Sequence, residues 1–308
     1  MPVKKFLIVR LAKAAVTVWF IVSLVFILTR LSGDPTDWML PDDASLEARM
    51  ELRESLGLDK PVLEQYGIYI SDVFHGDMGK SYYYLRPVGE LFGERAEATV
   101  KLAVTAFSLA ILLGVPLGVL ASVYRNTVFD RLTMGVTIAG YTIPNFVLGI
   151  LMIFLFSLKL RVLPSGGFGE AKNYVMPVLA MMVGPMANIA RLTRSSMLDV
   201  LKQDYLDCAR AKGVVEWLVV FKHALRNALI PVVTIIGLQM GTLIGGMVVV
   251  ETVFAWPGIG SLLISAAKNR DFPVVQYGIM ICAIIVCVTN MLVDLSYALL
   301  DPRIRDNF

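Results

Sequence analysis

Between Leu102 and Ser122 the chain reads LAVTAFSLAILLGVPLGVLAS, a run without a single charged residue. A helix needs about 20 mostly apolar residues to cross the hydrocarbon core of a membrane. Six segments meet this measure, at roughly 9–31, 98–122, 132–158, 174–190, 229–250 and 274–299. The fourth is the weakest, because Pro177 and Pro185 interrupt it. The sequence therefore predicts an all-α membrane protein with six transmembrane helices.

The composition agrees with this class. Of the 308 residues, 56% are apolar and 17% are charged, whereas soluble domains contain about 25% charged residues. The net charge of +3, without any block of consecutive basic residues, gives no support to nucleic-acid binding. Cys208, Cys282 and Cys287 have no metal-ligand spacing, and His75 and His223 lie far apart. We expect neither a disulfide framework nor a metal site.

Basic residues indicate the orientation, because Lys and Arg are enriched in cytoplasmic loops. They concentrate before the first span, in segment 191–226 and in the C-terminal tail, which fall on one side of the membrane if there are six spans. Segment 32–97 falls on the other side and holds fourteen acidic against six basic residues. The first span is not followed by a signal-peptide cleavage pattern, so we expect it to be retained. Both termini are therefore predicted to be cytoplasmic.

The stretch FHGDMGKS, from Phe74 to Ser81, ends like a nucleotide-binding phosphate loop. The first glycine of such a loop would have to stand at position 74, where this chain has Phe. The stretch also lies in the segment assigned to the outside. Neither a metalloprotease nor a serine-hydrolase motif is present. We expect no catalytic residues and no ATP hydrolysis by this chain.

The cytoplasmic loop at 204–227 contains two helix-prone stretches. The first, 206–212, stops at Gly213, which is typical of a helix end. The second, 216–227, places four apolar residues on one face: Trp217, Phe221, Ala224 and Leu225. Two short helices joined at a glycine can dock into a groove of a partner. The alternative is an amphipathic helix that rests on the lipid headgroups.

Asp207, Cys208 and Ala209, followed after three residues by Gly213, resemble the EAA loop of binding-protein-dependent ABC importer permeases. In that family a short helix of this loop sits in a cleft of the ATPase subunit. Cys208 here replaces an alanine, and Arg226 stands where many members have proline. The resemblance implies that the residues coupling the chain to the ATPase are Asp207, Ala209, Arg210, Ala211, Lys212, Gly213 and Trp217.

Further segments resemble the dipeptide, oligopeptide and nickel permeases over almost the whole chain. They are LSGDP (31–35), LGLDKP (56–61), GDMGKS (76–81), LPSGG (163–167), ARAKG (209–213), ETVF (251–254), PGIG (257–260) and VDLSYALLDPR (293–303). The resemblance implies one permease domain, 1–308, with a first helix at 9–31, an extracytoplasmic insertion at 32–97 and a permease core at 98–305.

The same resemblance implies a membrane-spanning subunit of an ATP-driven importer, with di- or oligopeptides as the best guess for the solute. Its partners would be a second homologous permease, two ATP-binding subunits, an extracytoplasmic solute-binding protein and the lipid bilayer of a bacterial inner membrane. ATP and Mg would be used by the ATP-binding subunits, and this chain would carry no cofactor.

Other polar and small residues suggest further sites. Gly237, Gly241 and Gly245 form a stripe in the fifth span that indicates close helix packing or the wall of a solute pathway. Asp294 is the one carboxylate well inside a span. It indicates a structural role or, as an alternative function, the proton site of an ion-coupled secondary carrier.

The stretch ETVFAWPGIG, 251–260, is broken by Pro257 and lies at the outer mouth in the resembled family. The residues expected to contact the solute-binding protein are Asp34, Asp77, Glu251 and Trp256. Trp256 can instead anchor the chain at the membrane interface. In the insertion, Ser45 and Gly57 predict the start and the stop of a short helix.

Overall fold

The computed structural model describes the backbone of residues 3–41 and 43–300, and the side chains of 8–37, 39–41, 43–241, 243 and 245–293. In this part of the chain the regular structure is helical, apart from an isolated antiparallel bridge between Lys80 and Pro87. The predicted all-α class is confirmed.

The chain forms two compact units. The core unit consists of 1–6, 98–257 and 288–308, and the N-terminal unit consists of 7–97 and 258–287. The N-terminal unit therefore takes in the predicted insertion together with residues that the sequence assigned to the permease core.

The helices up to the middle of the chain are α1 (Val3–Leu31), α2 (Thr36–Met39), α3 (Leu46–Ser55), α4 (Val62–His75), α5 (Val88–Val123), α6 (Val128–Thr142), α7 (Asn145–Met152) and the π-helical η1 (Ile153–Lys159). They are followed by α8 (Ala171–Val200), α9 (Asp204–Ala211), α10 (Glu216–Leu218), the π-helical η2 (Val219–Ala224), α11 (Leu225–Val253), α12 (Ile259–Lys268) and α13 (Phe272–Leu300).

Five of the described helices are long and apolar enough to cross a membrane: Ile8–Leu31, Val88–Val123, Ala171–Val200, Glu216–Gly241 and Phe272–Val293. A sixth candidate is the pair formed by α6 with α7 and η1, which is bent by 102°. The bend falls at Pro144, and Ile143 before it is extended, because a proline disfavours the helical conformation of its predecessor. The predicted fourth span, in contrast, is an unbroken helix that contains both of its prolines.

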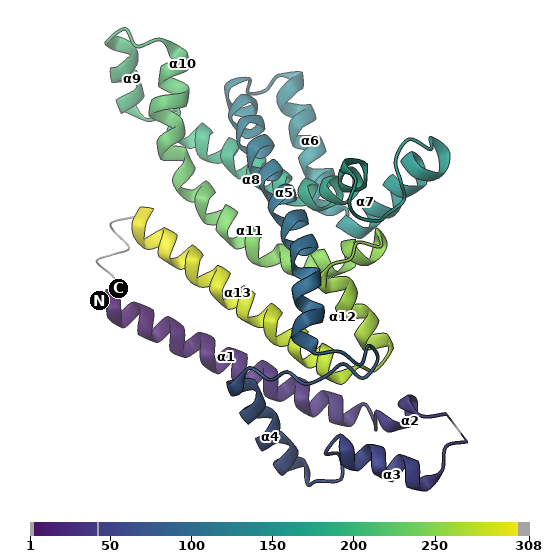
Figure 1. The fold of residues 1–308 in the computed structure, drawn as a ribbon. Helices are drawn as coiled ribbons and strands as arrows, with labels where there is room; N and C mark the ends of the chain where they lie inside the picture. Colours follow the sequence, from purple (N-terminus) through teal and green to yellow (C-terminus); the bar gives the residue numbers. More distant parts are fainter. Residues whose placement is uncertain (1–2, 42, 301–308) are drawn as a thin grey trace. The chain divides into compact units, whose positions relative to one another are not determined.

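In the core unit, α8 packs against α6, α7 and α11 (Figure 1). Helix α5 approaches α8 closely through Gly114 and Gly118. A methyl group on Gly118 would lie 2.5 Å from the carbonyl oxygen of Ala190, and one on Gly114 would lie 2.9 Å from that of Met186. These two glycines serve close helix packing, as small residues do in membrane helices.

A buried ion pair also joins α6 to α8. Arg194 donates to both carboxylate oxygens of Asp130, from Nε at 2.6 Å and from Nη2 at 2.8 Å. The Asp130 side chain is only 4% exposed. A paired and bidentate geometry is what allows a buried charge to be tolerated.

The N-terminal unit confirms the short helix in the insertion and explains the phosphate-loop-like stretch. Ser45 caps α3 by accepting from the backbone of Ala48, and Gly57 has a positive φ of 65°. Ser81 donates its hydroxyl to the buried carboxylate of Asp271, which also accepts from the backbone of Tyr82 at 2.9 Å. The hydroxyl that would contact a phosphate in a nucleotide-binding loop is therefore already bonded to a carboxylate. The loop instead stabilises the fold of this unit.

Candidate functional site

The loop at 204–227, which the sequence predicts to be cytoplasmic, forms a compact hairpin at one end of α11 (Figure 1). Helix α9 ends at Ala211, and Gly213 has a positive φ of 79°, so the predicted glycine stop is confirmed. After Gly213 the chain enters α10 and continues without a break through η2 into α11. The expected second short helix is therefore the beginning of the fifth span, because the π-helical turn carries the helix onward.

Two sets of polar contacts brace this hairpin. Arg210 binds Glu216 through Nη2 at 3.0 Å and Asp207 through Nη1 at 2.8 Å. The hydrogen bonds to Glu216 and then to Asp207 raise the pKa of Arg210 above its usual value. On the other side, Asn227 donates to the hydroxyl of Tyr205 at 2.7 Å. The two arms of the hairpin are thereby joined at both ends.

A buried cluster connects the hairpin to the membrane helices. Leu206 of α9 is fully buried together with Val219 and Ala224 of η2, Met197 of α8 and Val119 of α5. A close-packed interior transmits displacement because it has low compressibility. The cluster therefore links the hairpin to α5, α8 and α11 through continuous packing contacts, which can transmit a displacement of the hairpin.

The outer surface of the hairpin carries exposed aromatic side chains among charged ones. Trp217 is 64% exposed and Phe221 is 51% exposed, and Tyr205 of α9 and Val215 before α10 are exposed as well. Asp207, Ala211, Lys212 and Gly213 are also exposed, whereas Ala209 and Arg210 are half-buried. The predicted apolar face is split, because Ala224 is buried in the cluster while Trp217 and Phe221 point away from it. The π-helical register accounts for this difference from the expected helical spacing.

Two cavities of the core unit have polar side chains in otherwise apolar walls, and the sequence did not predict them. One cavity of about 210 Å³ and another of about 500 Å³ share three lining residues, which are Tyr141, Asn188 and Gln239. Arg191 lines the larger cavity, lies over the ring of Tyr141 at 5.7 Å and donates to Asn188 Oδ1 at 3.3 Å. Amide side chains within apolar spans were the available signal, since polar groups at membrane depth are costly and mark pathways.

The glycine stripe of α11 divides between two environments. A methyl group on Gly237 would lie 2.7 Å from Val293 of α13. This close approach supports the helix-packing interpretation of that glycine. A methyl group on Gly245 would meet nothing within 4 Å. The lining of the smaller cavity includes Gly246 rather than the predicted stripe. A pathway role of Gly237, Gly241 and Gly245 remains a prediction, and the side chain of Asp294 lies outside the described residues.

The last turn of α11 and the segment after it are buried rather than exposed to a partner. Trp256 is fully buried, donates from Nε1 to the carbonyl of Ala98 at 3.0 Å and packs perpendicular to the rings of Phe168 and Tyr174. Glu251 is fully buried as well and accepts from Thr99 at 2.7 Å. Neither side chain offers surface to a binding protein in this conformation, and Trp256 cannot anchor at the membrane interface. Through these hydrogen bonds both side chains fix the non-helical segment between α11 and α12 against α5.

The other two expected contact residues lie in the N-terminal unit. Asp34 accepts from Thr36 and pairs with Arg53 at 2.5 Å. Burial opposes ionisation of Asp34, but these hydrogen bonds and the charge of Arg53 lower its pKa. Asp77 is exposed and accepts from the backbone of Gly79 at 2.9 Å. No group of three potential metal ligands occurs among the described residues.

Comparison with known proteins identifies the family to which this chain belongs. The family described as "Binding-protein-dependent transport system inner membrane component" matches residues 114–306, and its N-terminal companion matches residues 3–103. The chain belongs to this family. It is a multi-pass permease subunit of an ABC importer in the inner membrane, and such a subunit is itself non-catalytic. The alternative of an ion-coupled secondary carrier is therefore wrong.

Relatives of the permease cover its whole length. It is 41% identical over 301 residues to the glutathione transport system permease protein GsiC of Escherichia coli strain K12, covering 97% of this chain and 98% of that protein. The protein of the same name from Shigella flexneri serotype 5b is 40% identical with the same coverage. Members of the family work with a partner permease, with ATPases and with a binding protein.

Two solved structures share the fold of the permease. An amino acid ABC transporter crystallised with histidines matches 68% of this chain and 94% of that chain, with a TM-score of 0.56 and 14% identity. An inward-facing MetNI methionine ABC transporter matches 68% of this chain and 96% of that chain, with a TM-score of 0.57 and 20% identity.

Proposed function

We propose that this permease imports short peptides across the bacterial inner membrane. The observation that carries this proposal is the similarity, over almost the full length, to permeases of glutathione transport systems, because glutathione is itself a short peptide. The permease would form the solute pathway together with a second, homologous permease. An extracytoplasmic binding protein would deliver the solute, and two ATP-binding subunits would bind ATP and Mg.

The hairpin of α9, α10 and η2 would dock on an ATP-binding subunit. Its exposed Trp217 and Phe221 give it the aromatic surface that is typical of the energetically important part of an interface. The cluster around Leu206 and the contacts of Arg210 support movement of the hairpin as one body. In this role the hairpin, the N-terminus and the C-terminus would lie in the cytoplasm.

The polar cavities of the core unit would form part of the pathway. Tyr141, Asn188 and Gln239 supply hydrogen-bond donors and acceptors within an apolar bundle, and Arg191 adds a positive charge. Peptide groups and free carboxylates are recognised by this combination of amides and guanidinium. Closing of the ATP-binding subunits would change the access to these cavities.

The test is uptake of radiolabelled glutathione, and separately of a dipeptide, into proteoliposomes that hold the complete importer. Gly213→Pro forces φ to about −65° where the chain needs 79°, and it removes the N–H that bonds to the carbonyl of Arg210 at 2.9 Å. We expect ATP-driven uptake and solute-stimulated ATPase activity to fall at least tenfold.

The matched control is Gly169→Pro, which replaces another glycine of positive φ, 113°, in a loop away from the hairpin. We expect this variant to keep most of the activity. Uptake that is equal in wild type and in Gly213→Pro would refute the docking role. Failure of the wild-type importer to take up either peptide would refute the proposed solute class.

A further inference from the structure

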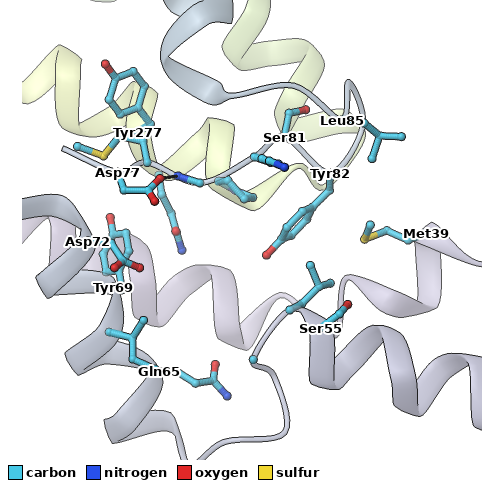
Figure 2. A pocket seen from close by; sticks show the side chains of 18 of the residues that line it. Met39, Ser55, Gln65, Tyr69, Asp72, Asp77, Ser81, Tyr82, Leu85 and Tyr277 are labelled. Carbon is cyan, nitrogen blue, oxygen red and sulfur yellow. Dashed lines mark hydrogen bonds between the residues drawn. The ribbon is translucent and has the colours of Figure 1, made fainter. Parts of the chain in front are cut away.

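The largest of the cavities described lies in the N-terminal unit, and the coupling mechanism makes no use of it. It has a volume of about 530 Å³, which is within the range of small-molecule sites, about 300–1,000 Å³. Its wall comes from the end of α1, from α3 and α4, from the loop at 76–87 and from the start of α13 (Figure 2). All of these segments belong to the same unit.

The charged side chains of this pocket balance one another. Two basic residues, Arg30 and Lys80, and two acidic residues, Asp72 and Asp77, line it. A site for a simple anion or a simple cation carries an excess of the opposite charge, because opposite charges attract the ligand and like charges repel it. The equal numbers favour a ligand that carries both signs.

The charges are also separated along the pocket. Figure 2 shows Asp72, Asp77 and Tyr69 on one side and Tyr82 on the other. Arg30 interacts electrostatically with Tyr82, so its guanidinium lies toward the Tyr82 side. Arg30 thus lies away from Asp72 and Asp77, and a dipolar ligand would bind with its opposite ends toward them.

Two polar groups at the pocket lack partners. Gln65 donates from Nε2 to the carbonyls of Lys60, at 2.7 Å, and Leu58, at 3.3 Å. These two acceptors fix the orientation of the amide, and its buried Oε1 has no hydrogen-bond partner among the described residues. The same holds for the buried Nε of Arg30. Unmade hydrogen bonds of buried groups are costly, and a ligand that supplies them is favoured.

Arg30 forms no direct ion pair in the described part of the chain, and Asp34 attracts it only from a distance. The nearby Asp34 is already occupied by Thr36 and Arg53. Arg30 lies instead over the ring of Phe26 at 5.2 Å. A guanidinium in this state is suited to bind a ligand carboxylate.

Two tyrosines of the pocket, Tyr69 and Tyr82, stay neutral. Burial, together with the proximity of Tyr66, raises the pKa of Tyr69 to about 12, and burial raises the pKa of Tyr82. Both phenols therefore keep their protons at neutral pH and can donate hydrogen bonds to the carbonyl groups of a ligand.

We propose that this pocket binds a short zwitterionic peptide, with its ammonium group toward Asp72 and Asp77 and its carboxylate toward Arg30. The amide nitrogen groups of such a ligand provide donors for Gln65. The inference rests on the proposed function, since it assigns a second site for the same class of solute. The site would act apart from the binding protein.

The test is binding of radiolabelled alanyl-phenylalanine to the full chain in lipid nanodiscs, without any partner. Two analogues each remove one charge: the N-acetylated dipeptide and the dipeptide amide. We expect the dipeptide to bind and each analogue to bind at least tenfold more weakly. Equal binding of the three compounds, or no binding of the dipeptide at 10 mM, would overturn the inference.

Variants then locate the binding. Arg30→Gln should weaken binding of the dipeptide at least tenfold but leave the already weak binding of the dipeptide amide unchanged. Asp72→Asn should likewise weaken binding of the dipeptide at least tenfold and leave the weak binding of the N-acetylated dipeptide unchanged. The matched controls are Arg131→Gln and Asp59→Asn, which replace exposed residues outside the pocket. Binding that is unchanged in both pocket variants would overturn the inference.

Two further measurements separate the possible outcomes. Thermal unfolding of each variant shows whether it remains folded. Asn188→Leu changes the proposed pathway cavity of the core unit and should leave intact the binding that depends on Arg30 and Asp72. If Asn188→Leu abolishes binding, the dipeptide occupies the core unit and the inference is wrong. Uptake by the complete importer tests the proposed function separately, because transport can persist when this pocket binds nothing.

Discussion

The ion pair between Asp130 and Arg194 offers the sharpest test of how the core unit is held together. It joins α6 to α8 through two hydrogen bonds, and Asp130 also accepts from the backbone of Asn126 at 2.9 Å. The side chain of Asp130 is 4% exposed and that of Arg194 is 23% exposed. Asp130→Asn removes the charge of one partner and keeps the shape of the side chain.

The magnitude follows from the burial. Removing one partner of a buried pair costs about 3–5 kcal/mol, because the other charge is left uncompensated. Arg194 is partly reached by solvent, so we expect the lower end, about 3 kcal/mol. For domains of about 150–250 residues about 1 kcal/mol corresponds to about 2–4 °C, and the shift is smaller for a longer chain such as this one. The thermal unfolding midpoint should therefore fall by roughly 4–6 °C.

The assay is thermal unfolding of the purified permease in detergent, followed by intrinsic fluorescence. The set includes Asp130→Asn, Arg194→Gln, the double variant and the control Asp59→Asn. We expect the double variant to lose much less than the sum of the single losses, with a coupling energy above about 1 kcal/mol. Additive losses, or a shift in Asp130→Asn no larger than in the control, would refute the reasoning.

Three further outcomes are expected. Gly118→Ala should destabilise the fold by about 1–3 kcal/mol through overpacking, whereas Gly245→Ala, in open space, should not; equal unfolding midpoints would contradict this. Trp256→Phe should cost about 1–3 kcal/mol in denaturant unfolding, because it removes the buried indole hydrogen bond and part of the buried side-chain volume, and a change below about 0.5 kcal/mol would disprove the role of the indole. Glu216→Gln should change stability by less than about 1 kcal/mol, since the pair with Arg210 is exposed. It should nevertheless lower solute-stimulated ATPase activity in the complete importer, and unchanged activity would count against bracing of the hairpin.

The sequence predicted those features that depend on local pattern. Apolar length indicated the spans, and Gly213 indicated the end of α9, because a positive φ strongly favours glycine. The segment with Pro177 and Pro185 was the weakest of the predicted spans, and the sequence did not predict the bend at Pro144. Pro144 lies at a bend, whereas Pro177 and Pro185 lie within α8, since the packing of neighbouring helices decides which freed carbonyls are satisfied.

The features that the sequence did not reveal depend on distant residues. Ser81 binds Asp271 from 190 positions away, and Arg194 binds Asp130 from 64 positions away. The burial of Trp256 depends in the same way on contacts with other segments. A single sequence carries no direct sign of such pairs. Gln239 in an otherwise apolar span was a signal of the polar cavity that the pattern did contain.

The central claim is that this chain is a gate moved by ATPases that it does not contain. The most direct measurement is peptide uptake by proteoliposomes that hold either the purified permease alone or the complete importer, each with internal ATP or with an imposed proton gradient. We predict uptake only by the complete importer and only with ATP. Uptake or ATP hydrolysis by the permease alone would contradict the account.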